Sequence, residues 1–269
     1  SGSQELNWLS VVGVLVGTAA VAGSSSVANQ ILERRTDRLM PRTESRPLAA
    51  GRLSQRTAWM FVAGSFLGGS GCVWLAGNWQ AACVAIATWV LYVTVYTPLK
   101  KITPLNTAVG AVAGSLPVAI GWFAVDGQQQ FLAGNASATL AVAALGTVLY
   151  LWQFPHFMAI AWLYRDQYRL AGLKMLTVTD PSGLRAAGQS LAASLAMVPV
   201  SLSMAVPSGS IRMFLAAALA STLYVLVSVN FAFRRDDRSA RILLFASLGV
   251  LLILMTSAIA FSSPKVLSG

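Results

Sequence analysis

The feature that most constrains this chain is a series of long stretches without a charged residue. Residues 57–99 carry no charge over 43 positions, and residues 6–32 carry none over 27. A helix needs about 20 apolar residues to cross a bilayer. The sequence therefore predicts an all-α, polytopic transmembrane helical bundle, with residues 1–269 forming one domain. The eight expected spans are residues 8–30, 57–77, 79–97, 104–125, 136–163, 187–206, 211–233 and 241–262.

The composition excludes an ordinary soluble enzyme. Only 10% of the residues are charged and 56% are hydrophobic, whereas a soluble domain has about 25% charged residues. The net charge of +10 would suggest nucleic acid as a partner in a soluble chain. Here 17 of the 19 basic residues fall in the loops after the first, third, fifth and seventh spans, and Arg212 and Lys265 are the exceptions. This pattern indicates orientation in a lipid bilayer and no nucleic-acid partner.

The same charge pattern indicates which side of the membrane carries the chemistry. Basic loops face the cytoplasm of a bacterium or the matrix of a mitochondrion. We expect the bacterial inner membrane, because no Arg- and Ser-rich transit segment is recognisable, and keep the mitochondrial inner membrane as the alternative. A single histidine excludes a multi-histidine metal site, and two cysteines within apolar runs provide no disulfide framework.

Three polar residues with helical spacing stand where the first span meets the basic loop. Asn29, Glu33 and Asp37 recur every four residues, which places them on one helix face about 6 Å apart along the axis. Carboxylate and amide oxygens are hard donors that suit Mg²⁺, and guanidinium groups bind phosphate oxygens. The arginines around them are Arg34, Arg35, Arg38, Arg42 and Arg46. The segment predicts a diphosphate site; the alternative is a solvated loop that holds the topology or binds anionic lipid headgroups.

Four segments give a more specific resemblance. The run N-x-x-x-E-x-x-x-D-x-x-M-x-R-T-x-x-R-P-L at residues 29–48 resembles the first motif of the UbiA superfamily of membrane prenyltransferases. Residues 96–101 (YTPLKK), 152–157 (WQFPHF) and 165–172 (RDQYRLAG) resemble later motifs of the same superfamily. Within it, the sequence is most similar to the branch that farnesylates heme b.

This resemblance implies a bundle of the UbiA type and a reaction in which the farnesyl group of farnesyl diphosphate passes to a vinyl group of heme b. The products would be heme O and diphosphate, and heme b would be a substrate and not a cofactor. Mg²⁺ would be the cofactor, and a heme A synthase would be the downstream partner. The implied catalytic residues are Asn29, Glu33, Asp37, Lys100 and His156. Those implied to bind the diphosphate are Arg38, Arg42, Arg46, Lys100, Arg165 and Tyr168, while Asn29, Glu33, Asp37 and, as a further candidate, Asp166 would hold the metal.

Two departures from the superfamily pattern bear on this expectation. The superfamily usually has nine spans, so we expect a first helix before Ser1, which means either that the chain is truncated or that its start was set too late. The superfamily also has Asp before the tyrosine of its later motif, where this chain has Gln167, with Asp166 one position earlier. A shift of one residue turns a helical side chain by about 100°, which weakens the expectation of a second metal ligand.

His156 and the overall function each leave alternatives open. His156 follows Pro155 inside a predicted span, where an ionisable group is a functional candidate; the alternative is a neutral histidine bonded to a carbonyl that the proline leaves without its usual donor. For the whole chain, the alternatives are a prenyltransferase with an aromatic acceptor such as hydroxybenzoate, a membrane transporter, and a truncated, inactive form.

Overall fold

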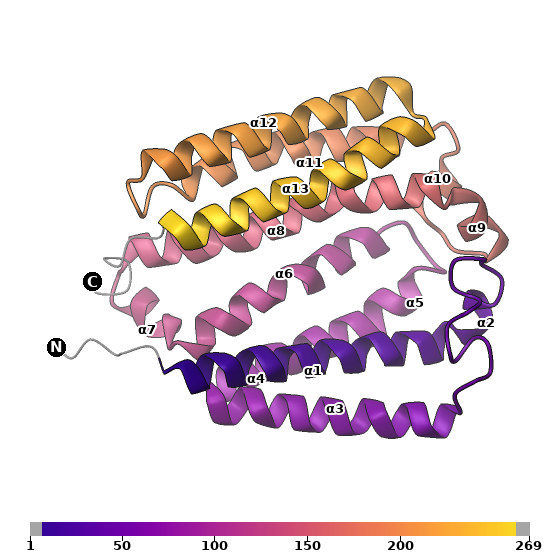
Figure 1. Cartoon of the computed structure of the whole chain (residues 1–269), viewed down its shortest axis with the longest axis horizontal. Coiled ribbons are helices and arrows are strands. Elements are labelled where there is room, and N and C mark those ends of the chain that lie inside the picture. The colour runs from indigo at the N-terminus through magenta and orange to yellow at the C-terminus, as the bar shows by residue number, and fades with distance from the viewer. Residues whose placement is uncertain (1–6, 262–269) are drawn as a thin grey trace. The chain divides into compact units, whose positions relative to one another are not determined.

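The computed structural model describes residues 7–261, and every regular element within them is helical (Figure 1). Within this described range, eight helices are long and apolar enough to cross a membrane, so the predicted all-α, eight-span fold class is confirmed. They are α1 (Trp8–Leu32), α3 (Gln55–Ala76), the continuous run of α4 (Trp79–Val90), η1 (Leu91–Tyr96) and α5 (Thr97–Leu99), α6 (Asn106–Ala124), α8 (Ala136–Leu163), α11 (Leu184–Ser203), α12 (Ile211–Arg234) and α13 (Asp237–Phe261).

The observed helix ends lie within a few residues of the predicted ones, and capping side chains account for several of the differences. The Ser54 hydroxyl accepts the Thr57 amide at 3.1 Å, so α3 begins two residues before the predicted span. Asn78 caps α4 through the Ala81 amide at 2.9 Å. Such caps satisfy amides that have no partner inside the helix. Residue 262, the predicted end of the last span, and Lys265 lie outside the described residues.

Four short helices in the connections were not predicted. They are α2 (Arg34–Asp37), α7 (Gly127–Leu132), α9 (Arg165–Leu170) and α10 (Leu176–Thr179). They are four to six residues long, too short for apolar periodicity to identify them.

The helices group into two compact units. Unit 1 holds the described part of Ser1–Gly127 together with Asp166–Met175, and unit 2 holds Gln128–Arg165 with the described part of Leu176–Gly269. The expectation of one domain over residues 1–269 stays a prediction.

In unit 1, the backbones of α1 and α3 approach each other closely at Gly17 and Gly69. A methyl group added at Gly17 would lie 2.8 Å from the Gly69 carbonyl oxygen, and one at Gly69 would lie 2.8 Å from that of Gly17. Only glycine permits this approach, which is a common device between membrane helices. The contact fixes the axis of α1, whose C-terminal end carries Asn29.

Unit 2 is built from α8, α11, α12 and α13. Its core contains the fully buried side chains of Met197, Tyr224, Phe231 and Leu243. Several buried serines point their hydroxyls at carbonyls of their own helix, as Ser190 does to Ala186 at 2.9 Å and Ser221 to Ala217 at 2.7 Å. Small residues whose hydroxyls are satisfied in this way allow helices to approach closely in an apolar environment.

Candidate functional site

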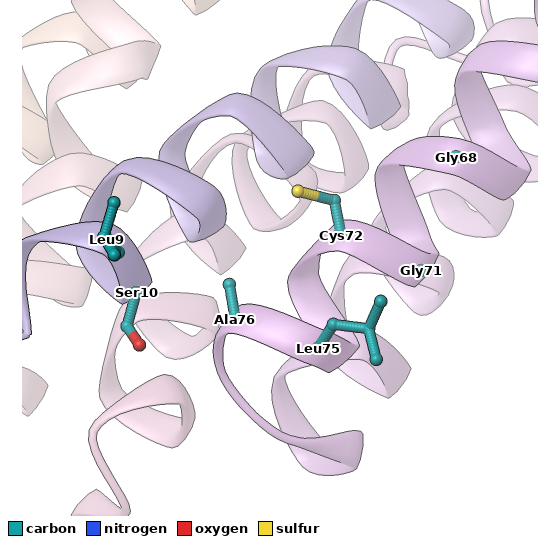
Figure 2. A pocket seen from close by; sticks show the side chains of 7 residues that line it. All are labelled: Leu9, Ser10, Gly68, Gly71, Cys72, Leu75 and Ala76. Atoms are coloured by element: carbon teal, nitrogen blue, oxygen red, sulfur yellow. The ribbon is translucent and has the colours of Figure 1, made fainter.

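An apolar groove lies at the start of α1 and the end of α3. Figure 2 shows the side chains that line it, which are Leu9, Ser10, Gly68, Gly71, Cys72, Leu75 and Ala76. None is charged, and the Cys72 thiol donates to the Gly13 carbonyl of α1 at 3.3 Å. The groove has the character of a lipid-facing surface, so the polar chemistry lies elsewhere in the unit.

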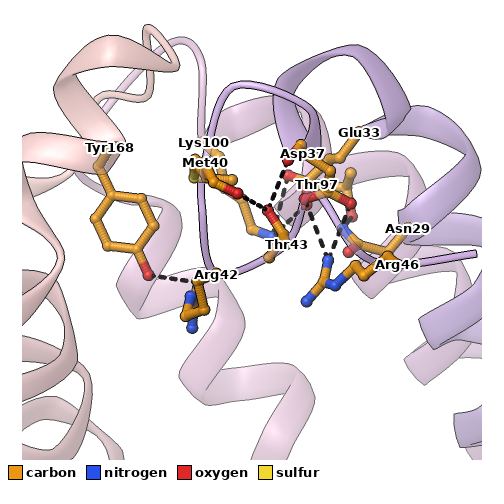
Figure 3. A network of polar contacts seen from close by, with 10 residues as sticks. All are labelled: Asn29, Glu33, Asp37, Met40, Arg42, Thr43, Arg46, Thr97, Lys100 and Tyr168. Carbon is orange, nitrogen blue, oxygen red and sulfur yellow. Dashed lines mark hydrogen bonds and ion pairs between the residues drawn. The ribbon is translucent and has the colours of Figure 1, made fainter. Parts of the chain in front are cut away.

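That chemistry lies at the other end of α1, where three predicted residues meet. The Glu33 amide bonds to the Asn29 carbonyl and the Asp37 amide to the Glu33 carbonyl, both at 2.8 Å, so the four-residue bonding continues across the break between α1 and α2. The three side chains therefore share one side of the chain (Figure 3). All are buried, with Asp37 only 1% exposed.

Each carboxylate is paired with a cation of unit 1: Glu33 with Lys100, 67 residues away, and Asp37 with Arg46, 9 residues away in the following loop. Both oxygens of Glu33 lie 3.1 Å from the Lys100 ammonium nitrogen. The Asp37 oxygens lie 3.0 and 3.2 Å from the Arg46 nitrogen Nη1. Buried charges need such partners because leaving water is costly for each of them. The structure thus unites the predicted acids with two of the predicted phosphate-binding cations.

Asn29 is held by an irregular stretch of the third span. Its amide nitrogen donates to the Thr97 hydroxyl at 3.0 Å, and this hydroxyl donates to the Tyr92 carbonyl at 2.9 Å. The Thr97 amide also bonds to Tyr92 O, five residues back, which is the bond pattern of a π-helix. Pro98 has no N–H to continue a regular ladder, and π-helical turns often occur at functional sites. With the nitrogen used as a donor, the Asn29 oxygen is the atom that could bind a cation.

Lys100 is positioned by contacts of both its side chain and its backbone. Its ammonium group lies 4.6 Å from the centroid of the Tyr96 ring, a favourable cation–π arrangement. A methyl group at Gly110 would lie 2.7 Å from that ring, so glycine is needed for α6 to pack beside Tyr96. The Lys100 carbonyl accepts the Lys174 amide at 2.6 Å, which ties the loop after α9 to this site.

Arg42 belongs to the loop after α2 and contacts two residues of helix α9. Its guanidinium donates to the Tyr168 hydroxyl at 3.1 Å, and its amide to the Gln167 side-chain oxygen at 3.4 Å. Burial raises the pKa of Tyr168, and the nearby Arg42 charge opposes this only in part. The phenol therefore keeps its proton at neutral pH and can donate it to a phosphate oxygen.

Three other predicted site residues have partners that do not belong to this cluster. Arg38 donates to the Ala49 carbonyl at 2.7 Å and braces the loop. Asp166 is exposed and pairs with Arg169 at 3.1 Å. Arg165 belongs to unit 2, where it bonds to Asp237 at 2.9 Å and to the Trp162 carbonyl at 2.7 Å. Their predicted roles in diphosphate and metal binding stay predictions.

His156 takes part in a separate polar cluster inside unit 2. Its nitrogen Nδ1 lies 2.8 Å from the Ser247 hydroxyl of α13, and its ring stacks on Trp152 with centroids 4.7 Å apart. The Tyr224 hydroxyl of α12 donates to the Trp152 carbonyl at 2.7 Å. Neither Ser247 nor Tyr224 could be selected from the sequence, because each stands in an apolar span far along the chain from His156.

The donor set at the end of α1 suits a hard divalent cation. It offers two carboxylates and one amide oxygen, and oxygens of a bound diphosphate could complete the coordination, as is usual for Mg²⁺. Within residues 7–261 there is no group of three or more His, Cys, Asp or Glu side chains that could hold a metal without such help. Oxygens of the substrate or of water would complete the coordination of a cation at this site.

Known proteins resemble this chain over most of its length. Residues 1–260 match the model of the UbiA prenyltransferase family. The protoheme IX farnesyltransferase of Rhodopirellula baltica is 43% identical over 267 residues, covering 95% of this chain and 90% of that protein. The mitochondrial protoheme IX farnesyltransferase of Arabidopsis thaliana is 41% identical over 204 residues, covering 74% of this chain and 44% of that protein.

Solved structures share the fold. A UbiA homolog from Aeropyrum pernix K1 superposes with a TM-score of 0.74 at 20% identity, covering 95% of this chain and 90% of the other. A digeranylgeranylglyceryl phosphate synthase gives the same TM-score at 16% identity, covering 97% and 88%. The predicted resemblance to this superfamily is confirmed.

Proposed function

Because this chain belongs to the UbiA prenyltransferase family, we propose that it transfers the farnesyl group of farnesyl diphosphate to a vinyl group of heme b, giving heme O and diphosphate. The acceptor is inferred from relatives named protoheme IX farnesyltransferase, of which one is 43% identical over nearly the whole chain. The observation that carries the proposal is the buried set of Asn29, Glu33 and Asp37 with Lys100 and Arg46 beside it.

The cations of the cluster would bind the diphosphate. Lys100 and Arg46 already lie 3.0 to 3.1 Å from carboxylate oxygens, so each is held at a place where a phosphate oxygen could replace its partner. Arg42 offers a third positive charge, and the buried Tyr168 hydroxyl adds a neutral donor. Fixed charges of this kind stabilise the negative charge that develops on the leaving diphosphate, which is usually the largest contribution to catalysis.

Members of this family use a divalent metal ion for diphosphate binding, and we propose Mg²⁺ held by Asn29, Glu33 and Asp37. When bound, the ion would neutralise part of the diphosphate charge and favour departure of the leaving group. The two carboxylates would then exchange an ion pair with Lys100 or Arg46 for a bond to the metal. Arg38, Arg165 and Asp166 are kept as weaker candidates for contacts to the diphosphate or the metal.

The apolar spans fit the remaining parts of the substrates. A farnesyl chain is soluble among membrane helices, and a site without bulk water protects an allylic cation from premature hydrolysis. We place the protein in a membrane as a multi-pass chain, with the bacterial inner membrane preferred because the bacterial relative combines 43% identity with coverage of 95% of this chain. A heme A synthase would be the partner that receives the product.

The identity of the acceptor is the direct test. The purified chain in lipid nanodiscs is incubated with farnesyl diphosphate and Mg²⁺, once with heme b and once with 4-hydroxybenzoate. We expect a product with the mass of heme O from heme b and no prenylated hydroxybenzoate. Prenylation of the hydroxybenzoate instead would contradict the proposal and favour an aromatic-acceptor enzyme.

A further inference from the structure

The polar cluster around His156 joins three of the four long helices of unit 2. Ser247 of α13 is fully buried, and its hydroxyl contacts two groups at once: the His156 nitrogen Nδ1 at 2.8 Å and the Leu244 carbonyl at 2.5 Å. The main-chain carbonyl of the same Ser247 accepts the Trp152 indole N–H at 2.7 Å. Ser247 therefore holds both the histidine and the tryptophan on which the histidine stacks.

These contacts assign the hydrogen on the histidine ring. A serine hydroxyl has one hydrogen, and a carbonyl oxygen can only accept a hydrogen bond. Because the Ser247 hydroxyl donates its hydrogen to the Leu244 carbonyl, it can only accept from His156. Nδ1 is thus the protonated nitrogen. In the neutral ring that suits an apolar span, the other nitrogen, Nε2, carries the lone pair.

The orientation of the ring is fixed as well as its hydrogen. One face of the imidazole lies on Trp152, with the two planes inclined by 23°. Trp152 is in turn anchored at both ends, by its indole N–H to Ser247 and by its carbonyl to the Tyr224 hydroxyl. An imidazole whose N–H is bonded to a second group and whose other nitrogen bears a fixed lone pair is the usual arrangement of a metal-binding histidine.

The reaction proposed above supplies a metal for such a ligand, because heme b contains iron and imidazole is a common axial ligand of heme iron. His156 is also the only histidine of the chain. We propose that His156 Nε2 binds the iron of the heme substrate, and that Ser247 is a positioning residue that fixes the ring in the required tautomer. This inference rests on the proposed function for the identity of its ligand.

Binding of heme can be measured without any transfer reaction. The full chain in nanodiscs is titrated with ferric heme b, without farnesyl diphosphate, and absorption and electron paramagnetic resonance spectra are recorded. We expect the spectra of histidine-ligated heme in the unchanged protein. His156→Ala should abolish them, and free imidazole should restore them, which also shows that the variant has kept its fold.

Ser247→Ala tests the positioning role. Loss of a group that orients a metal ligand weakens metal affinity by about 10- to 100-fold, so the dissociation constant for heme should rise at least tenfold. The matched control is Ser228→Ala, the same change at a fully buried serine whose hydroxyl has no hydrogen-bond partner. That variant should bind heme like the unchanged protein.

Three results would overturn the inference. Unchanged heme spectra in His156→Ala would show that another group binds the iron. Spectra without histidine ligation in the unchanged protein would show that His156 does not bind it. Equal heme affinity in Ser247→Ala and Ser228→Ala would remove the role of Ser247. Histidine-ligated heme without heme O formation would instead contradict the proposed function and leave this inference standing.

Discussion

The two units satisfy their buried polar groups in different ways. In unit 1, Glu33 and Asp37 are matched by the full charges of Lys100 and Arg46. In unit 2, His156 and Trp152 are matched by a serine hydroxyl, a serine carbonyl and a tyrosine hydroxyl, none of them charged. Opposite charges can exchange partners when a charged ligand arrives, whereas neutral bonds to helix carbonyls fix a side chain in one place. The difference indicates that unit 1 is suited to a charged ligand and unit 2 to orientation of a neutral group.

The largest expected effect comes from removing one charge of a buried pair in unit 1. Lys100→Met leaves Glu33 without a counter-charge, which typically destabilises a protein by about 3–5 kcal/mol. Combining it with Glu33→Gln removes both charges and should recover most of that loss. Thermal unfolding in nanodiscs measures both variants. A double variant as unstable as Lys100→Met alone would show that the pair is not the cause.

If the carboxylates and cations of unit 1 exchange partners as proposed, a divalent cation and a diphosphate should each bind more tightly when the other is present. Mg²⁺ must displace Lys100 and Arg46 from the carboxylates, and these two cations are then available to the diphosphate. Coupling between binding sites is typically 5- to 150-fold. Calorimetric titration of Mg²⁺ with and without inorganic diphosphate should show tighter binding in its presence, by a factor in that range. Equal affinities would contradict the exchange.

A smaller effect is expected from one neutral bond in unit 2. Tyr224→Phe removes the hydroxyl that donates to the Trp152 carbonyl, and the net contribution of such a bond is about 1 kcal/mol. The unfolding free energy should fall by that amount, well below the effect of Lys100→Met. A loss as large as that of Lys100→Met would show that neutral and charged contacts do not differ as described.

The smallest effect is expected at the exposed surface. Asp180 accepts the Ser182 hydroxyl at 2.6 Å and the Arg185 amide at 2.8 Å at the start of α11. Its hydrogen bond to Ser182 is the main cause that lowers the pKa of this carboxyl. A lowered folded-state pKa stabilises the fold above the ordinary carboxyl pKa, and this contribution disappears as the pH falls through the lowered value.

Asp180→Asn should therefore lower stability at pH 7 by less than about 0.5 kcal/mol, as is usual for surface positions. The difference from the unchanged protein should shrink as acid is added below about pH 4, the ordinary carboxyl range. Unfolding midpoints at several pH values measure this. A difference that stays constant down to low pH would contradict the assignment of the lowered pKa to Asp180.

Local patterns in the sequence predicted the spans and the alignment of Asn29, Glu33 and Asp37. The spans follow from the absence of charge, and the alignment follows because four-residue bonding persists through the break after Leu32. The partners of these residues could not be predicted in the same way. Lys100 is 67 residues from Glu33 in the chain, and Ser247 is 91 residues from His156. Such contacts depend on how helices pack, which local periodicity does not encode.

Two further features could not be predicted from the sequence: the π-helical turn of the third span and the residue of α9 that contacts Arg42. The π-helical turn of η1 depends on Pro98 together with the Thr97 hydroxyl, and it brings Thr97 to Asn29. Gln167 departs from the superfamily pattern, yet its side chain accepts the Arg42 amide, while Asp166 lies at the surface. Only the three-dimensional arrangement distinguishes which of these neighbouring residues reaches the cluster.

In the proposed function, the two carboxylates of unit 1 serve farnesyl transfer to heme b. Heme O is quantified by mass spectrometry for Glu33→Gln and Asp37→Asn, beside the matched control Glu44→Gln, an exposed carboxylate of the same loop. We predict that each of the first two variants loses at least about 100-fold in rate, the scale of one key electrostatic contact, and that the control keeps full activity. Heme O formation at the unchanged rate in both variants would show that these carboxylates do not serve the transfer.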